Sequence, residues 1–373
     1  MNKRTIIHFM GMKSTKFGGL EKFILELIRT NPGLSFILVY NSIPESETYT
    51  RFLNIHDVKV EVIDFTSMNF LNQYNTYCSL YRKYEPDIIH FHFTSNHIGA
   101  LAARCSGIKN IYKTVHSCLT YNNKEIESYS QLTLGQRFNY FYGYANKLYT
   151  KILFVSDYTM RQYSNVFGLL PSYSKIYLGV DNPALDNRNH DDLAEFLPSD
   201  TRIITTIAFA HQLKGVDVLI KALPEIKEVT LLVIGLDDAP YTKFLRSLAI
   251  ESGVADRIIW VGITDNTLAY LKATDVYVQP SRTEALSLAA CEALSLGVPV
   301  VGSNVGGLPE VASVVFESEN HRELANVINE LLDDKEYYIQ MSDKARLKYL
   351  ENFQMVNAVS AYSYIYSRYA VIP

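Results

Sequence analysis

The chain has 373 residues, which is too long for one ordinary hydrophobic core, so two domains of roughly 150–200 residues are expected. Hydrophobic residues make up 48% and charged residues 20%, proportions that exclude a disordered chain. No apolar run approaches the roughly 18–20 residues that span a bilayer. The N-terminal segment MNKRTIIHFM has an apolar run that is too short for the core of a signal peptide.

The formal net charge of −4 hides an asymmetry between the two halves. Residues 1–180 contain 19 lysines and arginines against 12 acidic residues, and residues 181–373 contain 16 against 27. A basic first half favours an anionic partner, such as a membrane surface or a phosphorylated acceptor. A chance distribution of solvated charges explains the counts equally well. We expect no nucleic-acid partner.

The four cysteines have neither CxxC nor metal-ligand spacing, which is typical of reduced thiols in a cytoplasmic protein.

Short apolar runs alternate with amphipathic stretches along the first half, a pattern typical of βαβ units. Gly19–Thr30 places its apolar residues on one helical face. The expected strands are 5–10, 35–40, 58–63, 88–93, 111–115 and 152–155. The polar, acidic stretch 182–200 then interrupts the alternation and is interpreted as the connection between domains.

A second alternating series follows this connection. Its expected strands are 203–208, 230–234, 258–261, 276–279 and 299–302, and its expected helices are 216–223, 241–252 and 285–296. The sequence therefore predicts an α/β protein with two Rossmann-like, doubly wound domains facing a central cleft, with ligands outside the carboxyl ends of the strands. We expect an N-terminal domain (1–181), a C-terminal domain (182–351), and a terminal helix (352–373) that packs back on the first domain.

The most informative stretch is QPSRTEALSLAACEALSLGVPVVGSNVGGLPE, residues 279–310. Glu284 follows an expected strand, and Glu292 comes eight residues later on the expected helix. Amides at the start of a helix bind phosphate, so those of Leu286, Ser287 and Leu288 are candidates to hold one beside Glu284. Amides for phosphate and carboxylates for hydroxyls suit a sugar diphosphate. The alternative is a helix with two solvated glutamates.

This stretch resembles the donor-binding motif of family 4 glycosyltransferases, which are of the glycosyltransferase group 1 type. These enzymes have the GT-B fold, which consists of two Rossmann-like domains. The matching positions after the glutamate pair are Ala293, Gly297, Pro299, Val300, Gly306, Gly307, Pro309 and Glu310. The resemblance implies that Glu284 contacts hydroxyls of the donor sugar and that Glu292 contacts the ribose. It also implies that the C-terminal domain (182–351) binds the nucleotide sugar and that the N-terminal domain (1–181) binds the acceptor.

Two further matches lie in the first half. Gly18 and Gly19 open a helix after the first strand, where paired glycines allow close approach of a ligand and φ > 0. A tight turn needs the same residues, but the resemblance implies a loop over the donor phosphate. His116 ends a strand and matches a histidine beside the donor sugar, although a structural histidine is the usual interpretation of such a position. Cys118 stands where family members often carry Asp.

In the second half, Lys214 precedes a glycine at a helix start and would neutralise the departing diphosphate. The arginine of the family's usual Gly-Arg pair is missing, because Phe209 occupies its place, and His211 is the candidate to compensate. Gly235 follows an expected strand, in a turn that resembles the one near the nucleotide in these enzymes.

No metal site is expected. The acids Asp237 and Asp238 are interpreted as solvated rather than as an Asp-x-Asp motif. His90, His92 and His97 lack a fitting carboxylate.

Residues 140–151 mix aromatic and basic residues in a stretch of helical length. An interfacial helix on an anionic membrane has this pattern, and so has an ordinary packed helix.

The resemblance implies an enzyme without a cofactor that transfers a hexosyl or N-acetylhexosaminyl group from a UDP-sugar or GDP-sugar to a saccharide or lipid-linked acceptor. Retention of anomeric configuration and independence of metals are expected, in the cytoplasm or at the inner face of the cell membrane. A non-catalytic partner with the same fold is the alternative, favoured by the missing arginine. A nicotinamide-dependent dehydrogenase is disfavoured because no Gly-x-Gly-x-x-Gly turn is present, and an epimerase of related fold is a weaker option.

Overall fold

The computed structural model divides the chain into two compact units, Met1–Tyr177 with Val356–Pro373, and Leu178–Met355. It describes residues 3–11, 18–93, 97–121, 124–131, 145–183, 197–198, 201–208, 212–236 and 239–368. The statements below concern these residues. No helix among them is long and apolar enough to cross a membrane, and the four cysteines form no disulfide.

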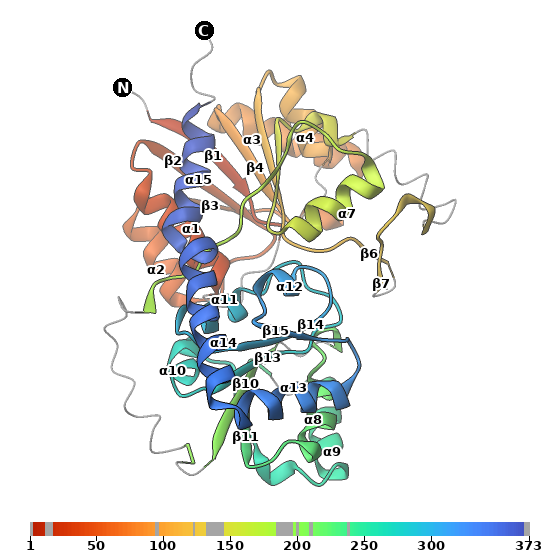
Figure 1. Cartoon of the computed structure of the whole chain (residues 1–373). Helices are drawn as coiled ribbons and strands as arrows, with labels where there is room; N and C mark the ends of the chain where they lie inside the picture. The colour runs from red at the N-terminus through yellow and green to blue at the C-terminus, as the bar shows by residue number, and fades with distance from the viewer. Residues whose placement is uncertain are drawn as a thin grey trace. The chain divides into compact units, whose positions relative to one another are not determined.

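Unit 1 is built on a parallel sheet whose seven described strands lie in the order β3-β2-β1-β4-β5-β8-β9 (Figure 1). The strands are β1 Arg4–Phe9, β2 Leu34–Tyr40, β3 Lys59–Val62, β4 Ile88–His92, β5 Asn110–Val115, β8 Lys151–Phe154 and β9 Tyr173–Lys175. A short antiparallel pair is formed by β6 Thr120–Tyr121 and β7 Lys124–Glu125. The helices are α1 Gly19–Thr30, α2 Glu47–Ile55, α3 Phe70–Tyr84, α4 His97–Cys105, α7 Asp157–Phe167 and α15 Met355–Arg368, with 3₁₀ turns η1 Phe65–Ser67, η2 Tyr129–Gln131 and η3 Asn146–Leu148.

The terminal helix α15 belongs to unit 1 although it is more than 170 residues from the rest of that unit in sequence. It runs beside α1 (Figure 1). The rings of Phe23 on α1 and Tyr362 on α15 meet edge to face with centroids 4.9 Å apart. Asn31 donates a hydrogen bond to Ser363 over 2.8 Å. Tyr366 of α15 packs against His8 and His90 on one face of the sheet. On the opposite face Ile7, Phe9 and Phe91 pack among other apolar residues.

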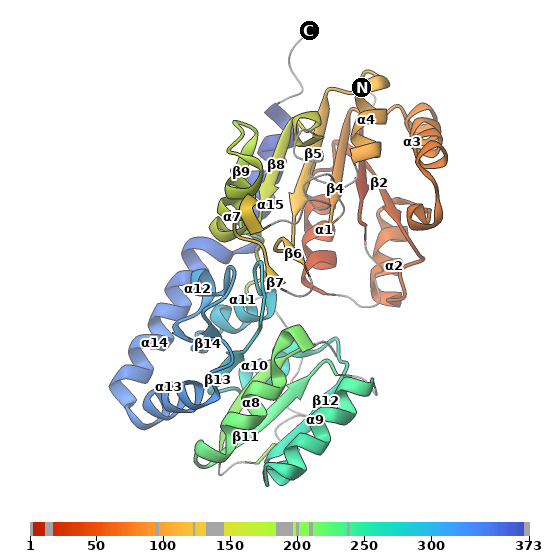
Figure 2. The ribbon, with the colours of Figure 1, turned by 90° about the vertical axis from the view of Figure 1, so that its right-hand side faces the viewer.

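Unit 2 repeats the architecture with a six-stranded parallel sheet in the order β12-β11-β10-β13-β14-β15 among its described residues. The strands are β10 Arg202–Ile207, β11 Val229–Ile234, β12 Ile258–Gly262, β13 Val276–Gln279, β14 Val300–Ser303 and β15 Val314–Phe316. The helices are α8 Val216–Ala222, α9 Pro240–Glu251, α10 Thr267–Lys272, α11 Leu288–Ser295, α12 Leu308–Val311, α13 His321–Asp333 and α14 Lys335–Lys348, with turns η6 Gln212–Lys214, η7 Leu223–Glu225, η8 Ala255–Arg257 and the π-helical η9 Tyr349–Phe353. Figure 2 shows α8 and α9 beside β11 and β12, and their apolar faces belong to one buried core.

Both sheets confirm the predicted Rossmann-like fold class. In each, the strand order runs outward in both directions from two central neighbours, β1 and β4 in unit 1 and β10 and β13 in unit 2. Such a pair is a topological switch point, and ligands of doubly wound sheets bind outside the carboxyl ends of the strands there. A ligand site of unit 2 is therefore expected at the loops after β10 and β13.

The stretch 140–151 is described only in part. Residues 140–144 lie outside the described residues, Ala145 is α-helical, the 3₁₀ helix η3 spans Asn146–Leu148, and Lys151 begins β8. The Lys151 ammonium donates to Ser174 over 3.0 Å on the neighbouring strand β9. The helix favoured here therefore does not reach Lys151, and over residues 140–144 it stays a prediction.

Candidate active site

The loop after β13 carries Glu284, and it is longer than the sequence predicted. The helix expected over 285–296 is α11 and begins only at Leu288, so Glu284 lies in a loop rather than at the helix start. Ser287 is the N-cap, with its hydroxyl accepting from the amide of Ala290 over 3.2 Å. A hydroxyl cap stops a helix from extending backwards because its own residue takes an extended backbone, here φ −86° and ψ 104°.

Glu284 meets Lys214 across the switch point. The Lys214 ammonium lies 2.6 Å from a Glu284 carboxylate oxygen, with side-chain exposures of 28% and 13% respectively. Lys214 ends η6 after β10, and Glu284 follows β13. The structure thus brings two of the predicted site residues, 70 positions apart in sequence, into one ion pair at the carboxyl edge of the sheet.

Two glycines hold the loops of this ion pair in place. Gly215 has φ +66°, and a Cβ there would lie 1.8 Å from the carbonyl oxygen of Pro280. Gly306 has φ +53°, and its Cβ would lie 2.0 Å from the carbonyl oxygen of Glu284. The same carbonyl accepts from the amide of Gly307 over 2.7 Å. Glycine is required at both positions by the backbone conformation and by the close approach of another backbone.

A buried chain of polar side chains runs from β13 to Glu284. The Tyr277 hydroxyl donates to the side-chain oxygen Oε1 of Gln279 over 2.6 Å, and the side-chain nitrogen Nε2 of Gln279 donates to the Ser281 hydroxyl over 2.9 Å. The Ser281 hydroxyl lies 3.5 Å from Glu284. Ser287 also donates to Gln279, over 3.1 Å, so the network connects Glu284 with the cap of α11. Buried polar groups that are mutually satisfied define one conformation, and this one orients the carboxylate.

Arg282 and Asp217 join the loop after β13 to the first turn of α8, and neither was predicted as a site residue. Arg282 donates two hydrogen bonds to Asp217, over 2.9 and 2.8 Å, and another to Glu319 over 3.0 Å. It also donates to the Gln212 carbonyl, and its amide donates to the Leu213 carbonyl over 2.7 Å. The sequence signal was an arginine two residues before Glu284 and an acid three residues after Lys214.

Substituting Asp217 with Asn should destabilise unit 2 by about 1–3 kcal/mol, because Arg282 loses a bidentate partner at a largely buried position. Burial by itself raises the pKa of Asp217, but its bonds with Arg282 and Tyr241 outweigh this and lower the pKa below its ordinary value. The stabilisation is therefore present above the unfolded-state pKa of about 3.9 and is lost as the pH falls through the lower folded pKa. Urea unfolding followed by the single tryptophan, Trp260 of unit 2, measures the difference at pH 7 and below pH 4.

The matched control is Lys221→Met, because Lys221 lies 3.7 Å from the same carboxylate but is 46% exposed. A change within about 0.5 kcal/mol is expected for such a surface pair. Equal losses in the two variants, or a difference that grows on acidification, would contradict the assignment.

Of the three amides proposed for phosphate, those of Ser287 and Leu288 lie at the start of α11, and that of Leu286 lies one residue before the cap. Leu288 is the first helical residue, Ser287 is the cap, and Leu286 precedes it. Among the described residues none of these three amides has an acceptor. The first amides of a helix lack intrahelical partners and carry the positive end of the helix dipole.

Glu292 and Gly235 are at other positions on unit 2. Glu292 lies within α11, half-buried, with the Thr267 hydroxyl 3.4 Å from its carboxylate. Gly235 follows β11 with φ +91°, and its amide donates to the Gly262 carbonyl over 2.7 Å. Gly235 and Gly262 lie at the carboxyl ends of two neighbouring strands, β11 and β12, and a role of Gly235 near a nucleotide stays a prediction. His211, Phe209, Asp237 and Asp238 lie outside the described residues.

In unit 1, Gly18 and Gly19 open α1, but not with the backbone that the sequence analysis expected. Gly18 is the N-cap with φ −99° and ψ −172°, and Gly19 is the first helical residue, so neither needs φ > 0. Glu21, only 3% exposed, accepts from the Gly18 amide over 3.1 Å. This capping arrangement gives Glu21 a local structural role at the start of α1.

His116 follows β5 and hydrogen-bonds to another histidine. Its Nε2 lies 2.9 Å from Nδ1 of His92, and its ring stacks on Phe93 with centroids 4.4 Å apart. Phe93 has φ +57°, an uncommon conformation for a bulky residue that persists only where surroundings enforce it. Burial lowers the pKa of His116 to about 3, so the ring is neutral at physiological pH.

The ring nitrogens of His8, His90 and His92 form the one cluster with metal-ligand spacing among the described residues. Their nitrogens already have hydrogen-bond partners, except Nε2 of His8. His97 lies outside this cluster, on α4.

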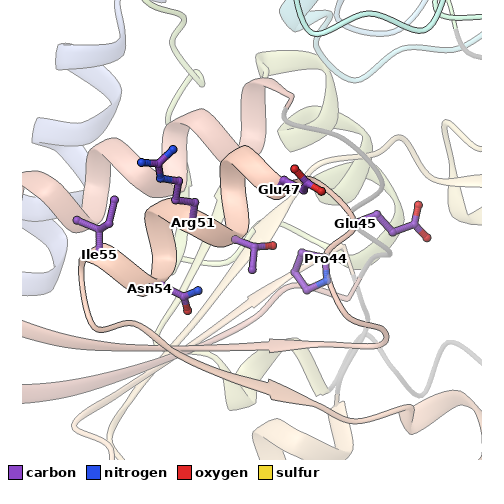
Figure 3. Close-up of a pocket in the computed structure, with 7 residues that line it drawn as sticks. Pro44, Glu45, Glu47, Arg51, Asn54 and Ile55 are labelled. Carbon is purple, nitrogen blue, oxygen red and sulfur yellow. The ribbon is translucent and has the colours of Figure 1, made fainter.

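Two surface pockets contain none of the predicted site residues. One, of about 580 Å³, is lined by a single segment of unit 1, residues from Pro44 to the end of α2 at Ile55, including Glu45, Glu47 and Arg51 (Figure 3). The other, of about 600 Å³, lies at the amino ends of β10, β11 and β13, opposite the edge that carries Glu284.

Two family models match the chain in succession. The model for Glycosyltransferase Family 4 matches residues 17–182, and the model for Glycosyl transferases group 1 matches residues 188–348. The chain belongs to this glycosyltransferase family. The resemblance drawn from residues 279–310 is thereby confirmed, and the switch-point ion pair of this family 4 member lies in its group 1 half.

Curated relatives with stated activities match this family 4 member over part of their length. The GDP-mannose-dependent alpha-(1-6)-phosphatidylinositol monomannoside mannosyltransferase of Mycobacterium tuberculosis is 29% identical over 216 residues, covering 52% of this chain and 56% of the relative. The N-acetyl-alpha-D-glucosaminyl L-malate synthase of Bacillus anthracis is 29% identical over 171 residues, covering 44% and 45%. The chain thus matches about half the length of these relatives.

A solved structure matches the whole of this family 4 member. The HepE protein of Anabaena, in complex with UDP, has a TM-score of 0.79 at 18% identity and covers 98% of this chain and 99% of that chain. At this identity the likeness establishes the fold.

Proposed function

We propose that this protein transfers a hexosyl or N-acetylhexosaminyl group from a nucleoside diphosphate sugar to an acceptor hydroxyl, with retention of anomeric configuration and without a metal ion. The observation that carries the proposal is the Lys214–Glu284 ion pair at the switch point of unit 2, beside the open amides at the start of α11. A cation with free amides suits a diphosphate, and a carboxylate suits sugar hydroxyls.

The donor roles follow from this arrangement. Lys214 and the amides of Leu286, Ser287 and Leu288 would bind the diphosphate and stabilise the charge that it gains on leaving. Glu284 would accept hydrogen bonds from hydroxyls of the transferred sugar, oriented by the network behind it. Glu292, on the helix that supplies the amides, is proposed to bind the ribose, as in the family resemblance. Gly18, Gly19, Gly235 and His211 are proposed as further donor contacts.

The proposed reaction is a front-face displacement. The bond between the anomeric carbon and the diphosphate oxygen breaks, and the acceptor oxygen bonds to the same face of that carbon. The acceptor's proton passes to the departing diphosphate oxygen, so no protein base is needed. Glu21 supports this path, because its carboxylate holds the Gly18 amide and is 3% exposed. An inverting enzyme would need a base on the opposite face.

The donor is proposed to carry UDP or GDP, since one relative is named for GDP-mannose and the matching Anabaena structure contains UDP. The acceptor is proposed to be a saccharide or a lipid-linked saccharide, since the mycobacterial relative is named for a phosphatidylinositol mannoside. Action in the cytoplasm, or peripherally at the inner face of the membrane, remains a prediction. The alternative of a non-catalytic partner rests on Phe209 in place of the usual arginine.

The test begins with a panel of UDP- and GDP-sugars in a thermal-shift screen, since a ligand at 100 times its Kd stabilises the folded state by about 2.7 kcal/mol. With the donor found, transfer is assayed in excess EDTA and the first product is examined by proton NMR. We expect unchanged turnover in EDTA and a product with the anomeric configuration of the donor.

Three outcomes would refute parts of the proposal. An inverted product would contradict the front-face path and make His116 or Glu21 the candidate base. Loss of turnover in EDTA, restored by Mn²⁺ or Mg²⁺, would contradict metal independence. Donor binding with neither transfer nor hydrolysis would favour the non-catalytic alternative.

A further inference from the structure

Three histidine rings of unit 1 are hydrogen-bonded in series. His8 lies within β1, His92 is the last residue of β4, and His116 follows β5. Nδ1 of His8 lies 3.0 Å from Nε2 of His92, and Nδ1 of His92 lies 2.9 Å from Nε2 of His116. His8 and His92 are both 0% exposed, whereas His116 is partly exposed.

The sheet places these rings on one face. β1, β4 and β5 are parallel neighbours, with His8 opposite His90 and His92 opposite Thr114. Side chains alternate between faces along a strand, so His8, His92 and the position two residues after Thr114 share a face. His92 and His116 are at the carboxyl edge, where ligands of such sheets bind, and His8 is deeper in the sheet.

Each of these rings carries one proton at neutral pH. Burial lowers the pKa of His8 and of His116 to about 3, and it lowers the pKa of His92 well below the ordinary value. A neutral imidazole has one donor and one acceptor nitrogen. With two nitrogen–nitrogen contacts in series, the three protons therefore all point towards His116 or all point towards His8.

The remaining nitrogen of His8 distinguishes the two patterns. Nε2 of His8 is buried and has no hydrogen-bond partner in the part of the chain that the structure describes. If the protons pointed towards His8, this atom would be a buried N–H without an acceptor. Such groups are rare, because the N–H gives up its hydrogen bonds with water and gains none in the folded state. If they point towards His116, it is an unprotonated nitrogen, and the proton of His116 is on Nδ1.

We propose that His8 and His92 are positioning residues that hold His116 in the tautomer protonated at Nδ1, so that His116 presents a fixed hydrogen-bond donor to its ligand. The identity of that ligand, the donor sugar or its phosphate, rests on the proposed function. Nδ1 of His116 has no acceptor among the described residues, and the stacked Phe93 ring limits rotation of the imidazole. The atom that His116 meets is therefore an acceptor oxygen, and Nδ1 cannot act as a base there.

Metal binding by the same cluster would need nitrogens that are already bonded. His90 uses Nδ1 with the Tyr366 hydroxyl over 2.6 Å and Nε2 with Thr114 over 2.8 Å. His8 and His92 use one another's nitrogens. Hydrogen bonding thus accounts for the cluster, and a metal would disrupt the series.

The direct test is long-range proton–nitrogen NMR on ligand-free protein labelled with ¹⁵N-histidine, which reports the tautomer of each ring. Nine histidines are present, and His116→Gln and His92→Asn assign the two signals. We expect His92 and His116 to be protonated at Nδ1. Protonation of His116 at Nε2, or one equivalent of zinc in the purified protein, would overturn the proposal. Because no substrate is used, this result is independent of the transferase activity.

A pair of variants at His92 tests the consequence for turnover. The amide nitrogen of His92→Asn stands near the place of Nδ1 and can still donate to His116, whereas that of His92→Gln stands near the place of Nε2 and cannot. We expect kcat within about 3-fold of wild type for His92→Asn and a fall of roughly 10- to 100-fold for His92→Gln, at similar melting temperatures. A purely structural role predicts equal losses, and that result would refute the positioning role.

Discussion

Glu284→Ala is expected to lower the rate of sugar transfer roughly 30- to 1,000-fold, because the transition state loses a charged hydrogen bond of about 2–4 kcal/mol. The carboxylate lies at the carboxyl edge of the sheet, and its polar partners are Lys214 at 2.6 Å and Ser281 at 3.5 Å. It is not part of the apolar core of unit 2, so the fold should persist. Steady-state kinetics with the donor found in the screen, beside circular dichroism, measure both effects.

Two further variants make this result specific. Glu225→Ala removes an exposed carboxylate of the same unit and should leave kcat unchanged. Lys214→Met combined with Glu284→Ala should cost less than the sum of the two single losses, because both groups act on one transferring sugar diphosphate. Turnover near the wild-type value in Glu284→Ala would refute the site assignment, and strict additivity would refute a shared role.

Gly306→Ala is expected to destabilise unit 2 by about 2–4 kcal/mol and to lower transfer at least about 10-fold. A Cβ at this position would lie 2.0 Å from the Glu284 carbonyl oxygen, and the backbone has φ +53°. Relief of that overlap requires the Glu284 loop to move, so stability and turnover should fall together. Urea unfolding followed by Trp260 fluorescence and kinetics with the same donor measure the two losses.

Gly253→Ala is the matched control. Gly253 lies in the same unit with φ +70°, and a Cβ there has no atom within 4 Å. It therefore carries the backbone cost of about 1 kcal/mol without the overlap and without contact with Glu284. Equal destabilisation by the two substitutions, or normal turnover in Gly306→Ala, would mean that the Gly306 contact does not position the Glu284 loop.

Much of the fold follows from the sequence because parallel strands buried on both faces are continuous apolar runs. The run 276–279 is β13, and Gly19–Thr30 is α1, residue for residue. The short strands β9 and β15 were missed, since three residues carry too little pattern. The helix start before α11 was misjudged, because the residues from Ala285 onward favour a helix and the Ser287 cap competes only in the folded loop.

The sequence by itself determined which side chains are available for chemistry. Glu284, Glu292 and Gly306 follow the family pattern in order and spacing within one segment, so the resemblance is visible in the sequence alone. What it could not determine is which residues meet across distant segments. The Lys214–Glu284 pair and the Arg282–Asp217 pair each join segments more than 60 residues apart.

Only the tertiary structure decided these contacts, because strand order in a doubly wound sheet makes neighbours of segments that are remote in the chain. The same is true of His8, His92 and His116, which became one hydrogen-bonded series when β1, β4 and β5 paired. As single histidines in a sequence, each has two possible tautomers. Burial in one sheet face, with one nitrogen left unpartnered, is what selects between them.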